Sequence, residues 1–280
     1  MVIQPLDTAD NKTMRVVKRL SQSHQARKKS GESIIEGPRL IEEALSAGLM
    51  PRLVVYSPQW VDRAEGRSFM VRLQALSAHL FYVTDRLFNE VSQVETPQGI
   101  LAVIPTPAPT SLEWLLSHAV APLLFPVAAG IQDPGNLGTL VRAALAAGAG
   151  AFGIAPGTVE PFNPKCVRAS AGALFRLPLV FLEGDWMERF AEERISLFAT
   201  AVEGGTPYFE ADWKKPCAVL FGNEGSGLAP ELLLQSKTVT IPMSPASESL
   251  NVSMAGAVLL FHAAYQRLQA GIGFLPPAVL

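Results

Sequence analysis

Apolar and polar positions alternate at short intervals along this chain, in the pattern of a layered α/β protein. Met14, Val17 and Leu20 recur at helical spacing, which predicts one amphipathic helix over 11–31. Short apolar runs then alternate with helical stretches. We expect strands at Ser33–Glu36, Arg52–Tyr56, Leu80–Val83 and Gln98–Ile104. Helices are expected at Pro38–Leu45, between the strand Arg52–Tyr56 and about Ala78, and at Asp85–Val91. This alternation predicts a small α/β domain.

A proline-rich segment follows this first part. Residues 105–110 read Pro-Thr-Pro-Ala-Pro-Thr, and three prolines in six residues fit neither a helix interior nor a central strand. We therefore expect a stiff linker there. The predicted organisation is a segment over 1–32, a small domain over 33–104, the linker over 105–110 and a larger domain over 111–280.

The second part has near-continuous apolar runs separated by helical patterns. Strands are expected at Pro122–Ala129, Ala151–Ile154, Leu177–Phe181, Ser196–Ala201, Cys217–Phe221 and Thr238–Ile241, and helices at Leu137–Ala147, Asp185–Arg194, Pro230–Gln235 and Ser249–Gln269. Strands that are apolar throughout are buried on both faces. The expected fold is therefore α/β, with a parallel sheet covered by helices on both faces.

The charge of the chain is unevenly distributed. The formal net charge is only −2, but the segment between Asn11 and Gly31 holds seven basic and no acidic side chains. The remainder has 16 basic against 25 acidic side chains. Such asymmetry suggests contact with nucleic acid or another anionic surface, although a solvated helix explains it equally well. The seven basic residues are Lys12, Arg15, Lys18, Arg19, Arg27, Lys28 and Lys29.

Composition also limits the compartment and the metal chemistry. Cys166 and Cys217 cannot form a disulfide framework, which favours a reducing cytoplasm. Two cysteines and four scattered histidines give no zinc-ligand spacing, so we expect no metal. We also expect no signal peptide and no membrane span, because no apolar stretch is long enough.

A literal GxGxxG pattern occurs at Gly148, Gly150 and Gly153. A dinucleotide fingerprint would have to follow a strand and open a helix, with an acidic residue about 20 positions later. Here the glycines end a helix and lead into a strand. We interpret them as a helix C-cap and a tight turn.

Three other segments each join the end of a predicted strand to a helix. The first, 131–142, holds Asn136, which could cap the helix, and Arg142. The second, 220–228, has three glycines around Glu224, which would let backbone approach a ligand closely. The third, 241–256, delivers Ser249 and Asn251 to a helix start, where Ser249 could simply be a cap. Each segment taken alone is also consistent with an ordinary capped helix or turn.

Together and in this order, the three segments resemble the motifs of the SpoU (TrmH-type) RNA 2′-O-ribose methyltransferases of the SPOUT superfamily. The first motif is matched by Asn136, Gly138 and Arg142, the second by Phe221, Gly222, Glu224 and Gly227, and the third by Ile241-Pro-Met243 and Ser249-Leu-Asn251-Val-Ser253. The stretch 163–178 is similar to another part of that family. The first half is similar to the family's substrate-binding domain, at Ile35-Glu36-Gly37 and Thr96-Pro-Gln-Gly99.

The resemblance implies a fold, a cofactor and a set of residue roles. It implies a C-terminal trefoil knot, S-adenosylmethionine as methyl donor and a homodimer formed through the catalytic domain. The implied cofactor-binding residues are Thr200, Gly222, Gly227, Ile241, Met243 and Leu250, and the implied catalytic residues are Arg142, Asn136, Glu224, Ser249 and Asn251. The basic segment would then bind RNA backbone through Arg15, Lys18, Arg19, Arg27, Lys28 and Lys29.

The resemblance leaves the substrate open and contains one departure. Ribosomal RNA is the expected substrate, with transfer RNA and a non-catalytic RNA-binding protein of the same fold as alternatives. The family usually has glycine two residues after the Ile-Pro-Met, where this chain has Pro245. Proline lacks a backbone N–H and fixes φ near −65°, so the geometry of this loop becomes a specific question for the structure.

Overall fold

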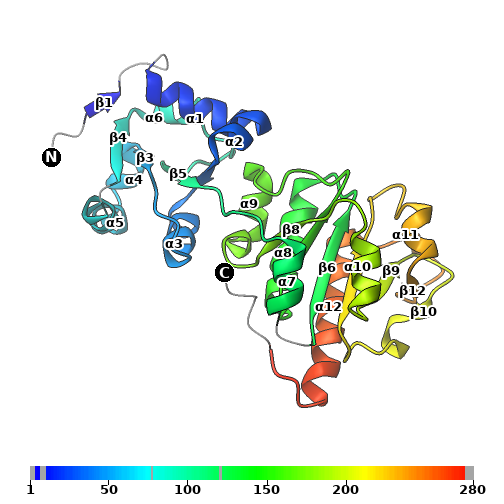
Figure 1. The fold of residues 1–280 in the computed structure, drawn as a ribbon. Helices are drawn as coiled ribbons and strands as arrows, with labels where there is room; N and C mark the ends of the chain where they lie inside the picture. The colour runs from blue at the N-terminus through cyan, green and yellow to red at the C-terminus, as the bar shows by residue number, and fades with distance from the viewer. Residues whose placement is uncertain (1–3, 7–10, 77, 120–121, 275–280) are drawn as a thin grey trace. The chain divides into compact units, whose positions relative to one another are not determined.

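The computed structural model describes residues 4–6, 11–76, 78–119 and 122–274 (Figure 1). It divides the chain into two compact units. The first unit comprises residues 1–107 together with 162–175, and the second comprises 108–161 together with 176–280. The segment 162–175 thus belongs with the N-terminal residues, although it lies between two strands of the second unit in the sequence.

The first unit is built on a five-stranded mixed sheet with the order β1-β4-β3-β5-β2. Strands β1, β4 and β3 run parallel, and β5 is antiparallel to both β3 and β2. The four predicted strands are all present, whereas β1 was not predicted from the sequence. The bounds are β1 Gln4–Leu6, β2 Glu32–Glu36, β3 Leu53–Tyr56, β4 His79–Val83 and β5 Ile100–Pro105.

Helices cover both faces of this sheet (Figure 1). Side chains from α1, α2 and α6 share one apolar cluster with Ile34, Val55 and Val103. Helices α3, α4 and α5 lie on the other side in Figure 1. The helix bounds are α1 Lys12–Gln22, α2 His24–Ser30, α3 Pro38–Ser46, α4 Pro58–Val61, α5 Ala64–Ala75 and α6 Asp85–Asn89.

The prediction of one continuous helix over 11–31 is wrong, because the segment forms two helices that meet at Ser23. The backbone of Ser23 is extended, and its N–H still donates to the Arg19 carbonyl oxygen at 3.0 Å. The Ser23 hydroxyl accepts a hydrogen bond from the Ala26 N–H at 3.2 Å, so it caps the second helix.

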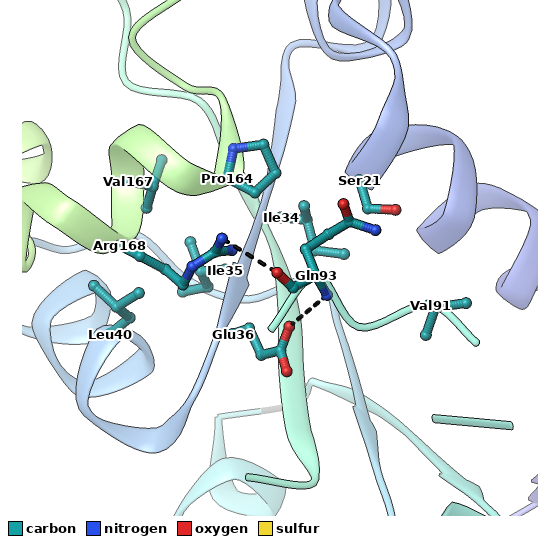
Figure 2. A pocket seen from close by; sticks show the side chains of 10 residues that line it. All are labelled: Ser21, Ile34, Ile35, Glu36, Leu40, Val91, Gln93, Pro164, Val167 and Arg168. Atoms are coloured by element: carbon teal, nitrogen blue, oxygen red, sulfur yellow. Dashed lines mark hydrogen bonds between the residues drawn. The ribbon is translucent and has the colours of Figure 1, made fainter. Parts of the chain in front are cut away.

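Helix α9 (Pro164–Ser170) packs on β2 within the first unit. Figure 2 shows Arg168 of this helix pointing at Gln93, where its Nη2 donates to the backbone carbonyl at 3.3 Å. The Gln93 N–H donates to the Glu36 carboxylate at 3.3 Å, and the Ser92 hydroxyl donates to the same carboxylate at 2.6 Å. Burial lowers the pKa of Arg168, an effect that the Glu36 charge opposes.

The second unit has a seven-stranded sheet with the order β10-β12-β9-β11-β6-β7-β8, in which every pairing is parallel. This confirms the predicted parallel sheet. The bounds are β6 Leu124–Ala129, β7 Phe152–Ala155, β8 Leu179–Phe181, β9 Ser196–Thr200, β10 Thr206–Pro207, β11 Cys217–Phe221 and β12 Lys237–Thr240.

Alternate side chains of the central strands meet helices on opposite faces. Phe125 and Leu220 belong to a cluster that includes side chains of α7 (Leu112–His118), α10 (Trp186–Glu192) and α11 (Pro230–Leu234). Phe221 faces the other way, toward α12 (Val252–Gln269), which packs tightly on α8 (Pro134–Ala146). A Cβ at Gly256 would lie 2.2 Å from the Leu140 side chain, so glycine allows this close helix pair.

The far end of α12 is held by a buried arginine. The Arg267 guanidinium donates to the carbonyl oxygens of Trp213 at 2.8 Å, Pro122 at 2.7 Å, and Leu123 and Lys215 at 3.0 Å each. These bonds satisfy backbone groups from two loops at once. They fix the helix whose opposite end begins at the candidate site.

The order of the strands identifies where a ligand would bind. The chain moves outward from β6 through β7 to β8, and then crosses to β9 on the far side of β11. Ligands of open parallel sheets bind at the carboxyl ends of the strands, near such a reversal. Within the part of the chain that the structure describes, no helix is long and apolar enough to cross a membrane.

Candidate active site

A hollow of about 380 Å³ lies where the loops after β9, β11 and β12 come together, and we call it the cofactor hollow. The three loops are at 200–202, 222–227 and 241–251. Of the predicted catalytic residues, Glu224, Ser249 and Asn251 line it. All six predicted cofactor-binding residues line it as well, namely Thr200, Gly222, Gly227, Ile241, Met243 and Leu250.

The loop after β11 folds back on itself and needs glycine to do so. Asn223 and Gly227 exchange backbone hydrogen bonds of 2.9 and 3.0 Å. A Cβ at Gly222 would lie 2.4 Å from the carbonyl carbon of Gly227, and Gly227 itself has φ +70°. Both glycines are therefore required by the backbone, apart from any ligand.

Asn223 organises this loop, and the sequence motif did not single it out. Its Oδ1 accepts hydrogen bonds from the N–H groups of Gly225 at 2.9 Å and Ser226 at 3.0 Å, and its Nδ2 donates to the Gly130 carbonyl oxygen at 3.0 Å. The first two bonds form an Asx-type turn, which the Asn-x-Gly spacing could have suggested. The third ties the loop after β11 to the end of β6.

Three predicted catalytic residues form one hydrogen-bonded network. The Asn136 Nδ2 donates to Glu224 Oε1 at 2.9 Å, and Asn251 Nδ2 donates to Asn136 Oδ1 at 2.8 Å. Asn251 Oδ1 in turn accepts from the Ser253 hydroxyl at 2.6 Å. The side chains come from α8, the β11 loop and the start of α12, so three segments distant in sequence converge here.

The Glu224 carboxylate sits at the N-terminal end of α8. It accepts backbone hydrogen bonds from Gln132 and Asp133, each at 3.1 Å, in addition to that from Asn136. Burial raises the pKa of Glu224, but hydrogen bonds from Asn136 and from the N–H groups of Gln132, Glu224 itself and Asp133 together hold that pKa below its ordinary value. The carboxylate therefore stays ionised at neutral pH.

Arg142 and Ser249 are positioned differently from the other three. Arg142 is exposed on α8, about 9 Å along the helix axis from Asn136, and it does not join the network. Ser249 is exposed at the rim of the cofactor hollow. Neither side chain makes a hydrogen bond or ion pair to the described residues, so both are available to a bound molecule.

The helix caps differ from those expected from the sequence. Helix α8 begins at Pro134 rather than Leu137, and Asp133 caps it by accepting from the Asn136 N–H at 2.9 Å. Helix α12 begins at Val252, and its cap is Asn251 rather than Ser249. Proline at a first helical position and an acidic cap before it explain the earlier start of α8.

Pro245 occupies a position that suits proline. The Ser247 N–H donates to the Ser244 carbonyl oxygen at 2.9 Å, which makes Pro245 the second residue of a β-turn. Proline is favoured there because its fixed φ matches the turn and no N–H is needed. Pro245 is exposed and does not line the cofactor hollow.

The glycines of the GxGxxG pattern have structural roles, as predicted. Gly148 follows the last residues of α8 with φ +77°, and Gly153 lies inside β7. A Cβ at Gly153 would lie 2.9 Å from Phe125, Val127 and Leu182, so this glycine is fixed by core packing.

The predicted RNA-contacting side chains lie on α1 and α2 of the first unit, and one of them is buried. Arg27 is only 4% exposed, and its Nη1 donates to the Leu20 carbonyl oxygen at 2.5 Å. It lies seven residues after Leu20, on the apolar side of the segment. The other five, Arg15, Lys18, Arg19, Lys28 and Lys29, are exposed. Among the described residues there is no group of three or more side chains suited to a metal ion.

The fold and site together define a cofactor-dependent α/β enzyme, and comparison with known proteins identifies its class. Residues 124–261 match the SpoU rRNA Methylase family, and residues 11–102 match the MRM3-like substrate binding domain. An uncharacterized tRNA/rRNA methyltransferase of Synechocystis is 34% identical over 91% of this chain and 92% of its own length. The chain belongs to the SpoU rRNA methylase family, which confirms the resemblance.

Two characterised relatives support this membership. The 23S rRNA (guanosine(2553)-2′-O)-methyltransferase RlmP of Bacillus subtilis is 31% identical over 93% of this chain and 99% of its own length. The SpoU methyltransferase AviRb of Streptomyces viridochromogenes, solved with AdoMet, superimposes with a TM-score of 0.80 at 26% identity, covering 92% of this chain and all of that one.

Proposed function

We propose that this protein transfers a methyl group from S-adenosylmethionine to a ribose 2′-hydroxyl of ribosomal RNA. The observation that supports this best is the convergence of the three motifs. Residues of the second and third motifs line one hollow at the carboxyl ends of β9, β11 and β12. Asn136 of the first motif joins them through its hydrogen bonds with Glu224 and Asn251. The relatives named for 23S ribosomal RNA support the substrate.

The residues of the cofactor hollow fit S-adenosylmethionine. A volume of about 380 Å³ is within the range of pockets that bind small molecules. Ile241, Met243 and Leu250 offer apolar contact to a base, while the glycine-rich loop after β11 offers backbone groups to the polar parts. When bound, S-adenosylmethionine would supply a methyl group on a positively charged sulfur: the S–C bond breaks as the O–C bond forms, S-adenosylhomocysteine leaves, and the hydroxyl proton passes to solvent water.

The network is suited to orienting groups rather than to taking a proton. A general base should have a pKa near the working pH, but the hydrogen bonds to Glu224 hold its pKa low. Glu224 therefore fixes Asn136, and Asn136 fixes Asn251. The planar Arg142 guanidinium would hold an RNA phosphate and stabilise negative charge that develops on the acceptor oxygen. Ser249, at the rim, would contact the acceptor.

A homodimer through the catalytic unit is supported by one face of α12. Met254 is 62% exposed, Phe261 49% and Tyr265 58%, and Val258 and Leu268 are exposed on the same face. The spacing of four, three, four and three residues places all five on one stripe of the helix. An exposed apolar stripe of this length is typical of an interface, so we assign these side chains to the contact with the partner copy.

Three finer features complete the proposal. Membership of the SpoU family supports a C-terminal trefoil knot, which the loops at 222–227 and 241–251 would form. The five exposed side chains of the predicted RNA-contacting set, Arg15, Lys18, Arg19, Lys28 and Lys29, would hold the RNA backbone. Both cysteines are buried and neither forms a disulfide in the described structure, which fits a reducing cytoplasm. Burial raises the pKa of the Cys217 thiol to about 11, which keeps it unreactive.

The test is to map ribose methylation in ribosomal and transfer RNA from a strain lacking this protein. We expect one ribosomal nucleotide to lose its 2′-O-methyl group and to regain it with the purified protein. Loss at a transfer RNA nucleotide alone would refute the ribosomal assignment. Arg142→Ala should abolish turnover while S-adenosylmethionine affinity, measured by calorimetry, stays within about twofold, because Arg142 does not line the cofactor hollow. A wild-type protein that does not bind S-adenosylmethionine would refute the enzymatic role.

A further inference from the structure

A second hollow, of about 580 Å³, lies beside the cofactor hollow, and we call it the outer hollow. Asn223 and Gly227 line both, so the loop after β11 forms a wall common to the two. The outer hollow opens at the carboxyl ends of β6 and β7, on the side of α10 and α11. Of the predicted cofactor-binding residues, only Gly227 lines it.

The side chains that line the outer hollow suit an RNA base better than a phosphate group. No charged side chain lines it, so nothing there would neutralise a phosphate. Pro156 and Pro230 supply exposed apolar surface, and Trp186, which is only 5% exposed, adds a small part of its side chain. Gln132 and Ser226 supply polar groups. Proteins hold unstacked bases in this way, by contact with their faces and hydrogen bonds to their edges.

Gln132 links the outer hollow to the network. Its backbone N–H donates to Glu224 at 3.1 Å, and its side-chain Nε2 donates to the Gly157 carbonyl oxygen across the hollow. The Gln132 side chain is exposed, and its Oε1 accepts no hydrogen bond from the described residues. Gln132 thus lines the outer hollow with a side-chain oxygen that can accept a hydrogen bond, and its backbone binds Glu224 of the network.

We propose that the outer hollow holds an unpaired RNA base, either of the methylated nucleotide or of its immediate neighbour. This inference rests on the proposed function, because it takes the acceptor ribose to lie at the network. A base must leave its stack to enter such a hollow, which costs little in a loop or bulge and more in a paired stem. The protein would therefore select nucleotides that are already unpaired.

The first experiment tests the outer hollow without requiring turnover. The full chain, saturated with S-adenosylhomocysteine to fill the cofactor hollow, is titrated with guanosine, adenosine, cytidine, uridine and ribose 5-phosphate. At least one nucleoside should shift the backbone amide signals of Gly157 and Ser226 in a saturable way, and ribose 5-phosphate should not. Ala229→Trp, at an exposed residue that lines the hollow, should abolish these shifts. Shifts that persist in this variant, or that no nucleoside produces, would overturn the proposal.

The second experiment uses an RNA hairpin that contains the mapped nucleotide. Ala229→Trp should lower kcat/KM about tenfold or more, the scale of one lost base-stacking contact. The loss should largely disappear on hairpins that are abasic at the target or its neighbour. The matched control is Ala191→Trp, on the exposed side of α10. Gln132→Ala, which leaves the hollow open, should also lower kcat/KM, with unchanged affinity for S-adenosylmethionine. A loss that every abasic hairpin shares would refute base capture, whereas failure of the wild-type protein to methylate any RNA would refute the proposed function instead.

Discussion

Asn136 is the central member of the network, so replacing it by alanine removes both links at once. Its amide group donates to a carboxylate, Glu224, and accepts from a neutral amide, Asn251. A hydrogen bond to a charged group is worth about 1.5–3 kcal/mol and a neutral one about 0.5–1.5 kcal/mol. The groups are exposed, and water replaces part of each bond. We therefore expect Asn136→Ala to lower the free energy of unfolding by about 1–2 kcal/mol.

The effect on turnover should be larger than the effect on stability. Without Asn136, the start of α12 loses its link to Glu224, and a displacement of about 1 Å at a reacting group can cost about a hundredfold in rate. Urea unfolding gives the stability, and single-turnover methylation of the mapped RNA gives the rate. Thr139→Ala, an exposed change on the same helix, should alter neither by a measurable amount.

A double-mutant cycle of Asn136→Ala with Asn251→Ala decides whether the two side chains act together. Residues in direct contact usually show a coupling energy of about 0.5 kcal/mol or more, and we expect about 1 kcal/mol here. Stability effects that add within about 0.3 kcal/mol, together with unimpaired methylation by Asn136→Ala, would refute the reasoning.

Three further predictions follow from the same geometry. Gly222→Ala should weaken S-adenosylmethionine binding about tenfold by calorimetry, because a Cβ there meets the backbone of residues 227 and 228. Gly225→Ala should bind S-adenosylmethionine normally, because a Cβ there has only an ordinary contact, and equal affinities of the two variants would contradict this prediction. The lowered pKa of Glu224 contributes stability that is present above its ordinary pKa of 4.5 and is lost as the pH falls through the folded pKa. The free energy of unfolding of Glu224→Gln should therefore depend less on pH below pH 4.5 than that of the wild type, and identical curves would count against this prediction. Neutralising Lys28 and Lys29 together should reduce the slope of the logarithm of the RNA-binding constant against the logarithm of the salt concentration by about 1.5. An unchanged slope would mean that these lysines face solvent and do not contact RNA.

The sequence predicted the parallel sheet well because its strands are apolar throughout, as buried strands must be. It predicted the lining of the cofactor hollow through family resemblance, since residues of three separate loops cannot be brought together by periodicity alone. The three-residue strand β1 carries too little pattern to be recognised. The break at Ser23 was missed because serine also occurs inside helices, so its role as the cap of α2 shows only in the structure.

Other features depend on contacts between distant parts of the chain. Helix α9 has a visible cap, since the Lys165 N–H donates to Asn163 Oδ1 at 2.9 Å, but nothing local indicates that it packs on β2. The burial of Arg27 could have been suspected from its seven-residue spacing to Leu20. Asn223 was overlooked because its neighbours carry the motif, while its own side chain shapes the loop.

The excursion of residues 162–175 has a practical consequence for how this protein can be divided. The chain passes between the two units three times, at 107–108, 161–162 and 175–176, so no single cut separates them. Expressed alone, residues 1–107 would expose the part of β2 that α9 covers. Residues 108–280 would carry Pro164, Val167 and Leu174, all buried in the full chain, without their packing partners. We expect that truncation at the proline-rich segment will yield fragments that aggregate rather than domains that fold alone.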